Sequence, residues 1–284
     1  MTDSRIVKGV GVTVPANLAS SLRPADTPDT AAPTAVAVDL GSSTVGVWAA
    51  HRGTVDAPCG DAFTASRSLV RRGRIIDPAG CVALLSQLVR RFSQPIPDGG
   101  VVVACRPALA GDQDQAAMRG VLEEVFAPTR LVFIDTVRAA AIGSGAGAGS
   151  LLVADFGAQL TEVALLSHGR VITARRADIG TRDLTLGATV DVICGIVAQY
   201  IDELRDTTTA AELRPALTRG VLLVGGGAAL PDLRTTLSAV LRLPVHRAAS
   251  PRNAALNGAG LAAMSLLRRP APMRHRAEPA GGPS

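Results

Sequence analysis

The sequence predicts an α/β protein built from two similar halves that face one ligand. Three observations lead to this prediction. Residues 36–48 and 151–166 share one plan, in which an apolar strand ends in Asp-x-Gly, a turn follows and a second apolar strand leaves. Residues 220–228 form a third motif, an apolar run that ends in three successive glycines. Short β-branched runs bounded by glycine and polar residues are typical of strands and turns.

The first hairpin carries polar chemistry at its turn. Asp39 ends the first strand, and a carboxylate at a strand end can hold Mg²⁺ through water. Gly41 permits close backbone approach. Successive N–H groups of such a turn, together with the hydroxyls of Ser42, Ser43 and Thr44, can cradle a phosphate. The alternative is an ordinary hairpin whose carboxylate caps the N–H groups of its own turn.

The second hairpin and the triple glycine complete the predicted site. Asp155 and Gly157 repeat the positions of the first hairpin, and the same alternative applies to Asp155. Gly225, Gly226 and Gly227, followed by Ala228, let the backbone lie flat against a ligand. A helix predicted from Pro231 places its N-terminus nearby.

Helices and strands alternate between these motifs. Apolar residues at helical spacing predict helices, and continuous apolar runs predict strands covered on both faces. Residues 50–70 are too short and polar for more than a loop. The other predicted elements are a helix over 79–92, a strand over 101–104, a helix over 113–126, a strand over 131–134, a strand over 171–174, a helix over 184–204 and a helix over 231–241.

The order of these motifs resembles the actin-like ATPase superfamily, and is closest to bacterial actins of the MreB type. The resemblance covers residues 35–267. It implies the actin-like ATPase (ribonuclease H-like) fold, with two similar mixed-sheet α/β subdomains around a nucleotide cleft. Besides the three motifs, it rests on Arg72–Asp77, Val137–Gly143, Ala211–Gly220, Leu243–His246 and Asn257–Gly260.

The resemblance also sets the expected domain boundaries. Residues 1–34 are a disordered arm, 35–145 subdomain I, 146–267 subdomain II with the C-terminal connecting helix, and 268–284 a disordered basic tail. Gly143–Ser150 is the flexible joint between the halves. The family carries two outer lobes, IB and IIB, where this chain has short polar stretches. We therefore expect a shortened, divergent member that lacks both lobes.

The resemblance assigns roles to the site residues. It implies ATP and Mg²⁺ as ligands, with Asp39 and Asp155 at the metal and with Asp135 and Thr161 as the catalytic residues that act on the attacking water. The implied nucleotide-binding residues are Gly41, Ser42, Ser43, Thr44, Gly157, Ala158, Gln159, Gly225, Gly226, Gly227 and Ala228.

The second hairpin departs from the family pattern. The family has Asp-x-Gly-Gly-Gly-Thr-Thr-Glu, whereas this chain has Ala158, Gln159 and Leu160 after Gly157. If either replaced glycine needs a positive φ or a tight phosphate contact, the cost is on the order of 1 kcal/mol or more. The water-positioning region at Asp135–Val137 is altered too, whereas the first hairpin and the triple glycine are intact, so we expect ATP binding without efficient turnover.

Resemblance to MreB implies a role in cell shape, the bacterial cytoskeleton and wall synthesis, with weak or lost ATPase and filament activity. The implied partners are a full-length bacterial actin or a second copy of the chain. Two alternatives stay open: a nucleotide-gated assembly adaptor of the FtsA or pilus-assembly type, and a pseudo-ATPase scaffold. A sugar kinase needs a substrate-binding lobe and a catalytic base, which the shortened loops disfavour.

Composition sets the remaining expectations. The chain has 284 residues, 47% hydrophobic, and a net charge of +5, which permits weak, salt-sensitive membrane-surface contact through the tails but indicates no specific nucleic acid. Its four cysteines form no CxxC motif, so we expect reduced thiols. The first residues lack a signal-peptide core and no apolar run reaches membrane-spanning length. We expect a cytoplasmic protein that is free or associated with the membrane surface.

Overall fold

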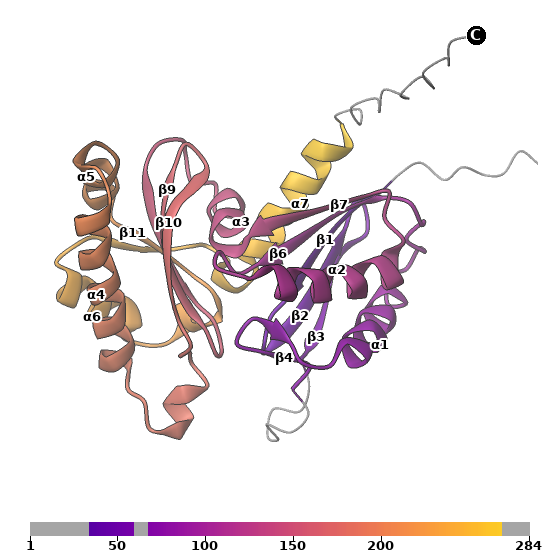
Figure 1. Cartoon of the computed structure of the whole chain (residues 1–284), viewed down its shortest axis with the longest axis horizontal. Helices are drawn as coiled ribbons and strands as arrows, with labels where there is room; N and C mark the ends of the chain where they lie inside the picture. The colour runs from indigo at the N-terminus through magenta and orange to yellow at the C-terminus, as the bar shows by residue number, and fades with distance from the viewer. Residues whose placement is uncertain (1–33, 60–67, 269–284) are drawn as a thin grey trace, which may run out of the picture. The chain divides into compact units, whose positions relative to one another are not determined.

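The computed structural model describes residues 34–59 and 68–268 (Figure 1). The predicted N-terminal arm and C-terminal basic tail lie outside the described residues, apart from Thr34 and Arg268 at their edges. Within the described ranges, no helix is both long enough and apolar enough to cross a membrane.

The first half is a five-stranded sheet in the order β3-β2-β1-β6-β7. Strands β1 to β3 pair antiparallel, and β1, β6 and β7 pair parallel. Two helices, α1 and α2, pack their apolar faces on one side of this sheet. The elements are β1 (Ala35–Leu40), β2 (Thr44–Ala49), β3 (Gly53–Pro58), α1 (Pro78–Val89), β6 (Val101–Arg106), α2 (Asp112–Phe126) and β7 (Arg130–Asp135).

The second half repeats this topology with the order β10-β9-β8-β11-β12. An antiparallel meander again leads into parallel strands, and α4, α5 and α6 supply the apolar residues that pack on one side of the sheet. The sequence prediction of two similar mixed-sheet α/β halves is confirmed. The elements are β8 (Leu151–Phe156), β9 (Thr161–Ser167), β10 (Arg170–Ala177), α4 (Val190–Thr207), α5 (Ala210–Arg219), β11 (Val221–Val224), α6 (Leu233–Leu241) and β12 (Val245–Arg247).

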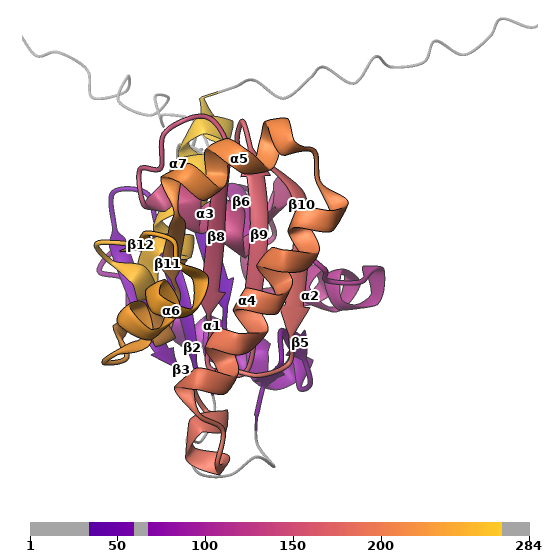
Figure 2. The same cartoon turned by 90° about the vertical axis from the view of Figure 1, so that its left-hand side faces the viewer.

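Two helices connect the halves. α3 (Thr136–Gly143) and α7 (Ala254–Leu267) pack against each other and lie between the two sheets (Figures 1 and 2). Their small apolar residues join one buried cluster with side chains from both sheets. The C-terminal helix α7 follows the second half in sequence but packs on β1 and β6 of the first.

Two local expectations need correction. Residues 50–70 are more than a loop, because β3 pairs along the whole of β2, and a small hairpin of β4 (Val70–Arg71) and β5 (Arg74–Ile75) follows. The helix expected over 184–204 begins at Val190, where the Thr189 side chain accepts a hydrogen bond from the Val192 N–H as N-cap. Residues 183–186 are instead a short 3₁₀ turn.

The chain is short where the outer lobes were expected to be missing. α4 ends at Thr207 and α5 begins at Ala210, so within the described residues only two threonines separate these helices. The other outer lobe would lie in the first half, between Pro58 and Val70, and residues 60–67 of that segment are outside the described chain.

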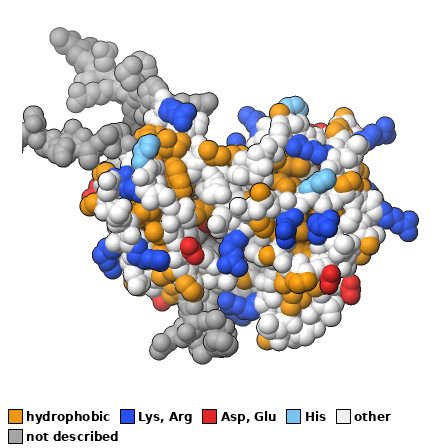
Figure 3. Space-filling model, turned by 180° about the vertical axis from the view of Figure 1, so that it is seen from behind, with side chains coloured by type: hydrophobic (Ala, Val, Ile, Leu, Met, Phe, Trp, Pro, Cys, Tyr) orange, Lys and Arg blue, Asp and Glu red, His pale blue; other side chains and the backbone are white. Residues whose placement is uncertain are grey.

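Basic side chains are spread thinly over the face drawn in Figure 3. They lie among hydrophobic and uncharged side chains and form no single patch on this face. Attraction of this face to a polyanion would therefore be diffuse.

Candidate functional site

A cavity of about 250 Å³ lies between the two Asp-x-Gly hairpins. Residues of both halves, and the segment Pro251–Asn253 that precedes α7, form its wall. The polar and turn residues of that wall are Asp39, Gly41, Ser42, Ser43, Thr44, Thr54, Asp56, Gly73, Thr136, Asp155, Gly157, Ala158, Leu160, Glu162, Thr181, Gly225, Gly226, Arg252 and Asn253.

The two hairpin turns have the same construction. The Gly41 N–H donates to the Thr44 carbonyl at 3.1 Å, and the Gly157 N–H donates to the Leu160 carbonyl at 2.8 Å. A Cβ atom at Gly41 would lie 2.8 Å from the Thr44 oxygen, and one at Gly157 would lie 2.9 Å from the Leu160 oxygen. A side chain at Gly41 or Gly157 would collide with the carbonyl oxygen of its own turn, so both turns need glycine. The matching hydrogen bonds show that the two turns, which both line the cavity, have equivalent conformations.

The replaced glycines of the second turn carry no backbone strain. Neither Ala158 nor Gln159 has a positive φ. The turn is supported from behind, where the Thr181 N–H donates to the Gly157 carbonyl at 3.0 Å and the Arg182 N–H to the Ala158 carbonyl at 2.8 Å. The replacements therefore carry no cost from a positive φ, which is one of the two conditions under which they would be costly.

Two carboxylates dominate the electrostatics of the cavity. Asp39 is the second-last residue of β1 and Asp155 is the second-last residue of β8, so the equivalent strand of each half contributes one carboxylate. Burial raises the pKa of Asp39 to about 6. Burial and the charge of Asp39 raise the pKa of Asp155 to about 7. Carboxylates whose charges repel across a cavity are stabilised by a cation between them.

Glu162 is a third acid at this site that the sequence analysis did not select. It lies opposite Asp155 in the β8–β9 pair and is 2% exposed. Its Oε1 accepts a hydrogen bond from the Ala108 N–H of the first half at 2.8 Å. Burial, followed by the charge of Asp155, raises the pKa of Glu162 to about 8. The sequence signal that could have identified Glu162 is an acidic residue in an otherwise apolar strand.

The three glycines after β11 have different surroundings. Gly225 has φ +84° and a Cβ there would lie 2.2 Å from Asp155 Oδ1. A Cβ at Gly227 would lie 2.6 Å from Thr181 Cγ2, whereas one at Gly226 would meet nothing within 4 Å. Gly226 is exposed and lines the cavity, so it offers a flat surface to a ligand.

The segment before α7 is a second contribution that sequence reasoning missed. The Pro251 carbonyl accepts a hydrogen bond from the Gly225 N–H at 2.9 Å, which holds this segment against the triple glycine. Arg252 and Asn253 line the cavity, and Arg252 brings a positive charge to it. Proline at the start of a helix was the available signal.

The residues predicted to be catalytic do not line the cavity. Asp135 ends β7, and its Oδ1 lies 3.4 Å from the Nε of Arg106. The Thr161 hydroxyl is buried and donates to the Ile179 carbonyl at 2.8 Å. Of the predicted nucleotide-binding residues, Gln159, Gly227 and Ala228 are also absent from the wall, and the others line it.

The acids of the cavity fit a magnesium–phosphate complex better than a metal held by protein alone. Within the described residues, no group of three or more His, Cys, Asp or Glu side chains is placed to hold a metal ion. Mg²⁺ usually keeps several waters and is bound by one or two carboxylates together with substrate phosphates. Asp39 and Asp155 supply such a pair beside two glycine turns.

Comparisons with known proteins agree with this architecture. The family model described as MreB/Mbl protein matches residues 181–268. No curated protein matches the chain. Two crystal structures of MreB5 of Spiroplasma citri are similar to it. The one bound to AMPPNP has a TM-score of 0.67 and 15% identity over 82% of this chain and 97% of that chain. The one bound to ADP has a TM-score of 0.69 and 16% identity over 84% of this chain and 98% of that chain.

Two further solved structures share the fold. The ethanolamine utilization protein EutJ from Carboxydothermus hydrogenoformans has a TM-score of 0.61 and 17% identity over 81% of this chain and 89% of that chain. A PilM–PilN type IV pilus biogenesis complex has a TM-score of 0.57 and 14% identity over 81% of this chain and 98% of the matched chain.

The chain therefore has the actin-like ATPase fold, with the cavity between its two subdomains. Within that class, the family-model match and the MreB5 structures confirm the resemblance to MreB-type bacterial actins.

Proposed function

We propose that this protein binds ATP with Mg²⁺ in the cavity between its two Asp-x-Gly hairpins. The observation that carries the proposal is the facing pair of Asp39 and Asp155 beside two turns of equivalent construction. Bound Mg²⁺ would offset the charge of the phosphates. The matching MreB5 structures bound to AMPPNP and ADP support the same ligand class.

The chain's own residues divide the work of binding. The two turns offer backbone N–H groups, and Ser42, Ser43 and Thr44 add hydroxyls only on the side of the first turn. On the other side, the flat surface at Gly226 suits the nucleoside. Arg252 adds a positive charge to a wall that otherwise holds several acids.

Efficient turnover is not part of the proposal. Asp135 is paired with Arg106, and the Thr161 hydroxyl is committed to the Ile179 carbonyl. Glu162 lines the cavity, but its Oε1 accepts a hydrogen bond from the Ala108 N–H, and burial raises its pKa, which disfavours the ionised form that a general base requires. We therefore propose ATP binding with slow hydrolysis.

Binding is tested first by thermal unfolding with and without Mg²⁺ and ATP. A ligand at one hundred times its Kd stabilises the folded state by about 2.7 kcal/mol, which raises the melting temperature by several degrees for a protein of this size. Asp39→Ala removes one of the facing carboxylates and is expected to abolish the shift. A wild-type protein that shows no shift at millimolar ATP would contradict the proposal.

The cellular role that best fits this site is cytoskeletal. We propose an MreB-like protein of the bacterial cytoplasm that acts in cell shape and wall synthesis. Its partner is a full-length bacterial actin or a second copy of itself. The family-model match over residues 181–268 supports this assignment. Sedimentation with Mg²⁺ and ATP, alone and mixed with a full-length bacterial actin, tests it, and no pelleting in either mixture would contradict it.

Two observations favour a second candidate, a nucleotide-gated assembly adaptor. The fold similarity includes a PilM–PilN pilus biogenesis complex and EutJ, which are not named as actins. The direct junction of α4 and α5 also leaves little of the outer lobe through which actin-type polymers make contacts. ATP binding that alters stability but produces no polymer would favour the adaptor.

A further inference from the structure

The turn between β4 and β5 reaches across from the first half to the second. Arg72 and Gly73 form its tip, both with positive φ, as in a two-residue hairpin turn of type I′. Gly73 lines the cavity. A Cβ at Gly73 would lie 2.7 Å from Pro107 Cγ and 3.5 Å from Leu160 Cδ2, so the tip packs against residues of both halves.

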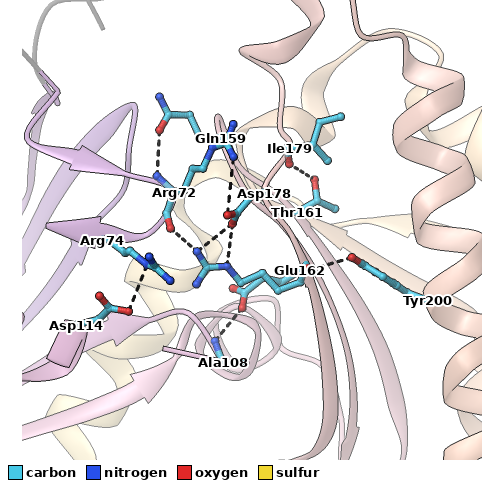
Figure 4. Close-up of polar contacts among 11 residues, drawn as sticks. Arg72, Arg74, Ala108, Asp114, Gln159, Thr161, Glu162, Asp178, Ile179 and Tyr200 are labelled. Carbon is cyan, nitrogen blue, oxygen red and sulfur yellow. Dashed lines mark hydrogen bonds and ion pairs between the residues drawn. The ribbon is translucent and has the colours of Figure 1, made fainter. Parts of the chain in front are cut away.

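Backbone atoms of this tip are held by side chains of the second half (Figure 4). The Arg72 N–H donates to Oε1 of Gln159 at 3.1 Å. Arg176 donates from its Nη2 to the Arg72 carbonyl. The backbone N–H and the backbone carbonyl of Arg72 are therefore both hydrogen-bonded to side chains of the second half, and neither contact uses the Arg72 side chain.

The side chain that binds the tip is itself positioned by the second half. Nη2 of Arg176 also contacts Oδ1 of Asp178 at 3.1 Å, and the Arg176 side chain is 11% exposed. The Tyr200 hydroxyl donates to the Arg176 carbonyl at 2.9 Å. Arg176 is thus anchored between β10 and α4. The Arg72 side chain lies 3.8 Å from Asp178, and both are about half exposed, so that ion pair adds little.

Gln159 joins this contact to the phosphate turn. It stands in the second hairpin turn, between Ala158 and Leu160, where the family pattern has glycine. Its side chain points out of the cavity to the Arg72 N–H, and Gln159 does not line the wall. A glycine there would leave the turn with no side chain to reach the other half.

We propose that Gln159 and Arg176 form a latch on the Arg72 backbone that holds the two halves closed along one wall of the cavity. The hydrogen bond from the Ala108 N–H to Glu162 closes the halves on the same side. Closure by the latch does not depend on a ligand. Its role in nucleotide exchange rests on the proposed function, because a nucleotide in the cavity leaves faster when this wall opens.

The first experiment measures closure without nucleotide. Spin labels are placed at Glu124→Cys in α2 and Asp206→Cys in α4, both exposed, while the four native cysteines are buried. Distances between the labels are measured by electron–electron double resonance. The latch predicts a longer and broader distribution in Gln159→Ala/Arg176→Ala than in the parent. An unchanged distribution in that folded double variant would overturn the proposal.

Two controls separate the latch from general effects. Gln199→Ala removes a glutamine whose Nε2 donates to Glu203 within α4, so the distances should not change. Arg72→Gly keeps the backbone N–H and carbonyl that the latch uses and relieves the positive φ of a non-glycine residue. Arg72→Gly should therefore stay closed, and opening in that variant would overturn the role given to the backbone.

The second experiment measures exchange with the fluorescent analogue N-methylanthraniloyl-ATP and Mg²⁺. The dissociation rate of the analogue should rise at least fivefold in Gln159→Ala and stay unchanged in Gln199→Ala. Equal dissociation rates in Gln159→Ala and Gln199→Ala would overturn the role of the latch in nucleotide exchange. The label distances would still test whether the latch holds the two halves closed. No binding of the analogue to wild type would overturn the exchange role together with the proposed function, and the closure result would stand separately.

Discussion

Gly143 of α3 and Gly258 of α7 meet at a helix–helix contact without side chains. A Cβ at Gly258 would lie 1.8 Å from the Ala139 carbonyl oxygen, and one at Gly143 would lie 2.7 Å from the Gly258 nitrogen. The backbones of the two connecting helices therefore touch. Because α3 leaves the first half and α7 returns to it after the second, this contact sets how the halves meet around the cavity.

Gly258→Ala should destabilise the protein strongly, because the added methyl group collides with backbone atoms that no side-chain rotation can move. Overpacking of this kind costs about 1–3 kcal/mol or more. Urea unfolding measures the loss. The matched control is Gly195→Ala in α4, where a Cβ meets nothing within 4 Å, and which should gain up to about 1 kcal/mol from helix propensity.

Gly225 and Gly226 should respond differently to the same change. Gly225→Ala forces a side chain into φ +84° and against Asp155, whereas Gly226→Ala meets open space. The first should lower the free energy of unfolding by at least about 1 kcal/mol, and the second should leave it within about 0.5 kcal/mol. Similar unfolding curves for the two variants would contradict the geometry of this turn.

The pH dependence of stability should reveal the two aspartates of the cavity, Asp39 and Asp155. Their pKa values, about 6 for Asp39 and about 7 for Asp155, exceed the unfolded value of 3.8. Between about pH 4 and pH 7 the folded chain therefore holds more protons, so their contribution to stability is full at the acid end and declines as pH rises.

Asp155→Asn removes the cost of ionising a carboxyl group in the cavity at high pH, without changing the shape of the side chain. At about pH 8 without Mg²⁺, the variant should unfold with a free energy higher than that of wild type by an amount on the order of a few kcal/mol. At about pH 4 the two should be close, because Asp155 is then protonated in the folded chain. Denaturant unfolding at both pH values checks this, and a difference that is the same at both would show that Asp155 does not titrate as described.

Much of the fold could be predicted because its signals are local. Apolar strands that end in Asp-x-Gly identified both hairpins, and helical spacing identified α1, α2 and α6. β3 was missed because its residues, Gly53–Pro58, are mostly exposed and contain no continuous apolar run, and they form a strand by pairing with β2. The start of α4 was misplaced because apolar spacing continued past its cap, Thr189, into the preceding turn.

The site residues that belong to the three sequence motifs could be predicted, whereas those brought to the cavity by tertiary packing could not. Asp39 and Asp155 line the cavity because they stand near the ends of equivalent strands in the two halves, and Gly226 lines it in the turn that follows β11. Glu162 and Arg252 were missed because only the register of β9 and the return of the chain before α7 bring them there. The latch was not predicted, since Arg72 and Gln159 lie far apart in sequence.

Asp135→Asn separates the role implied by the family resemblance from the one that the contacts support. Asp135 pairs with Arg106 away from the cavity wall, so the variant should keep the ATP affinity of wild type and lose about 1 kcal/mol or less of stability. Fluorescence titration with N-methylanthraniloyl-ATP measures the affinity. A tenfold loss of affinity with unchanged stability would instead place Asp135 at the ligand.

The most direct test of the account is calorimetric titration of wild type, Gly226→Val, Gly195→Val and Asp39→Ala with ATP and Mg²⁺. At Gly226 and Gly195 a Cβ meets open space, but only Gly226 lines the cavity. We predict that wild type and Gly195→Val bind alike, and that Gly226→Val and Asp39→Ala lose at least tenfold in affinity. No binding by wild type, or equal affinities in the two valine variants, would contradict the claim that this cavity is a nucleotide site.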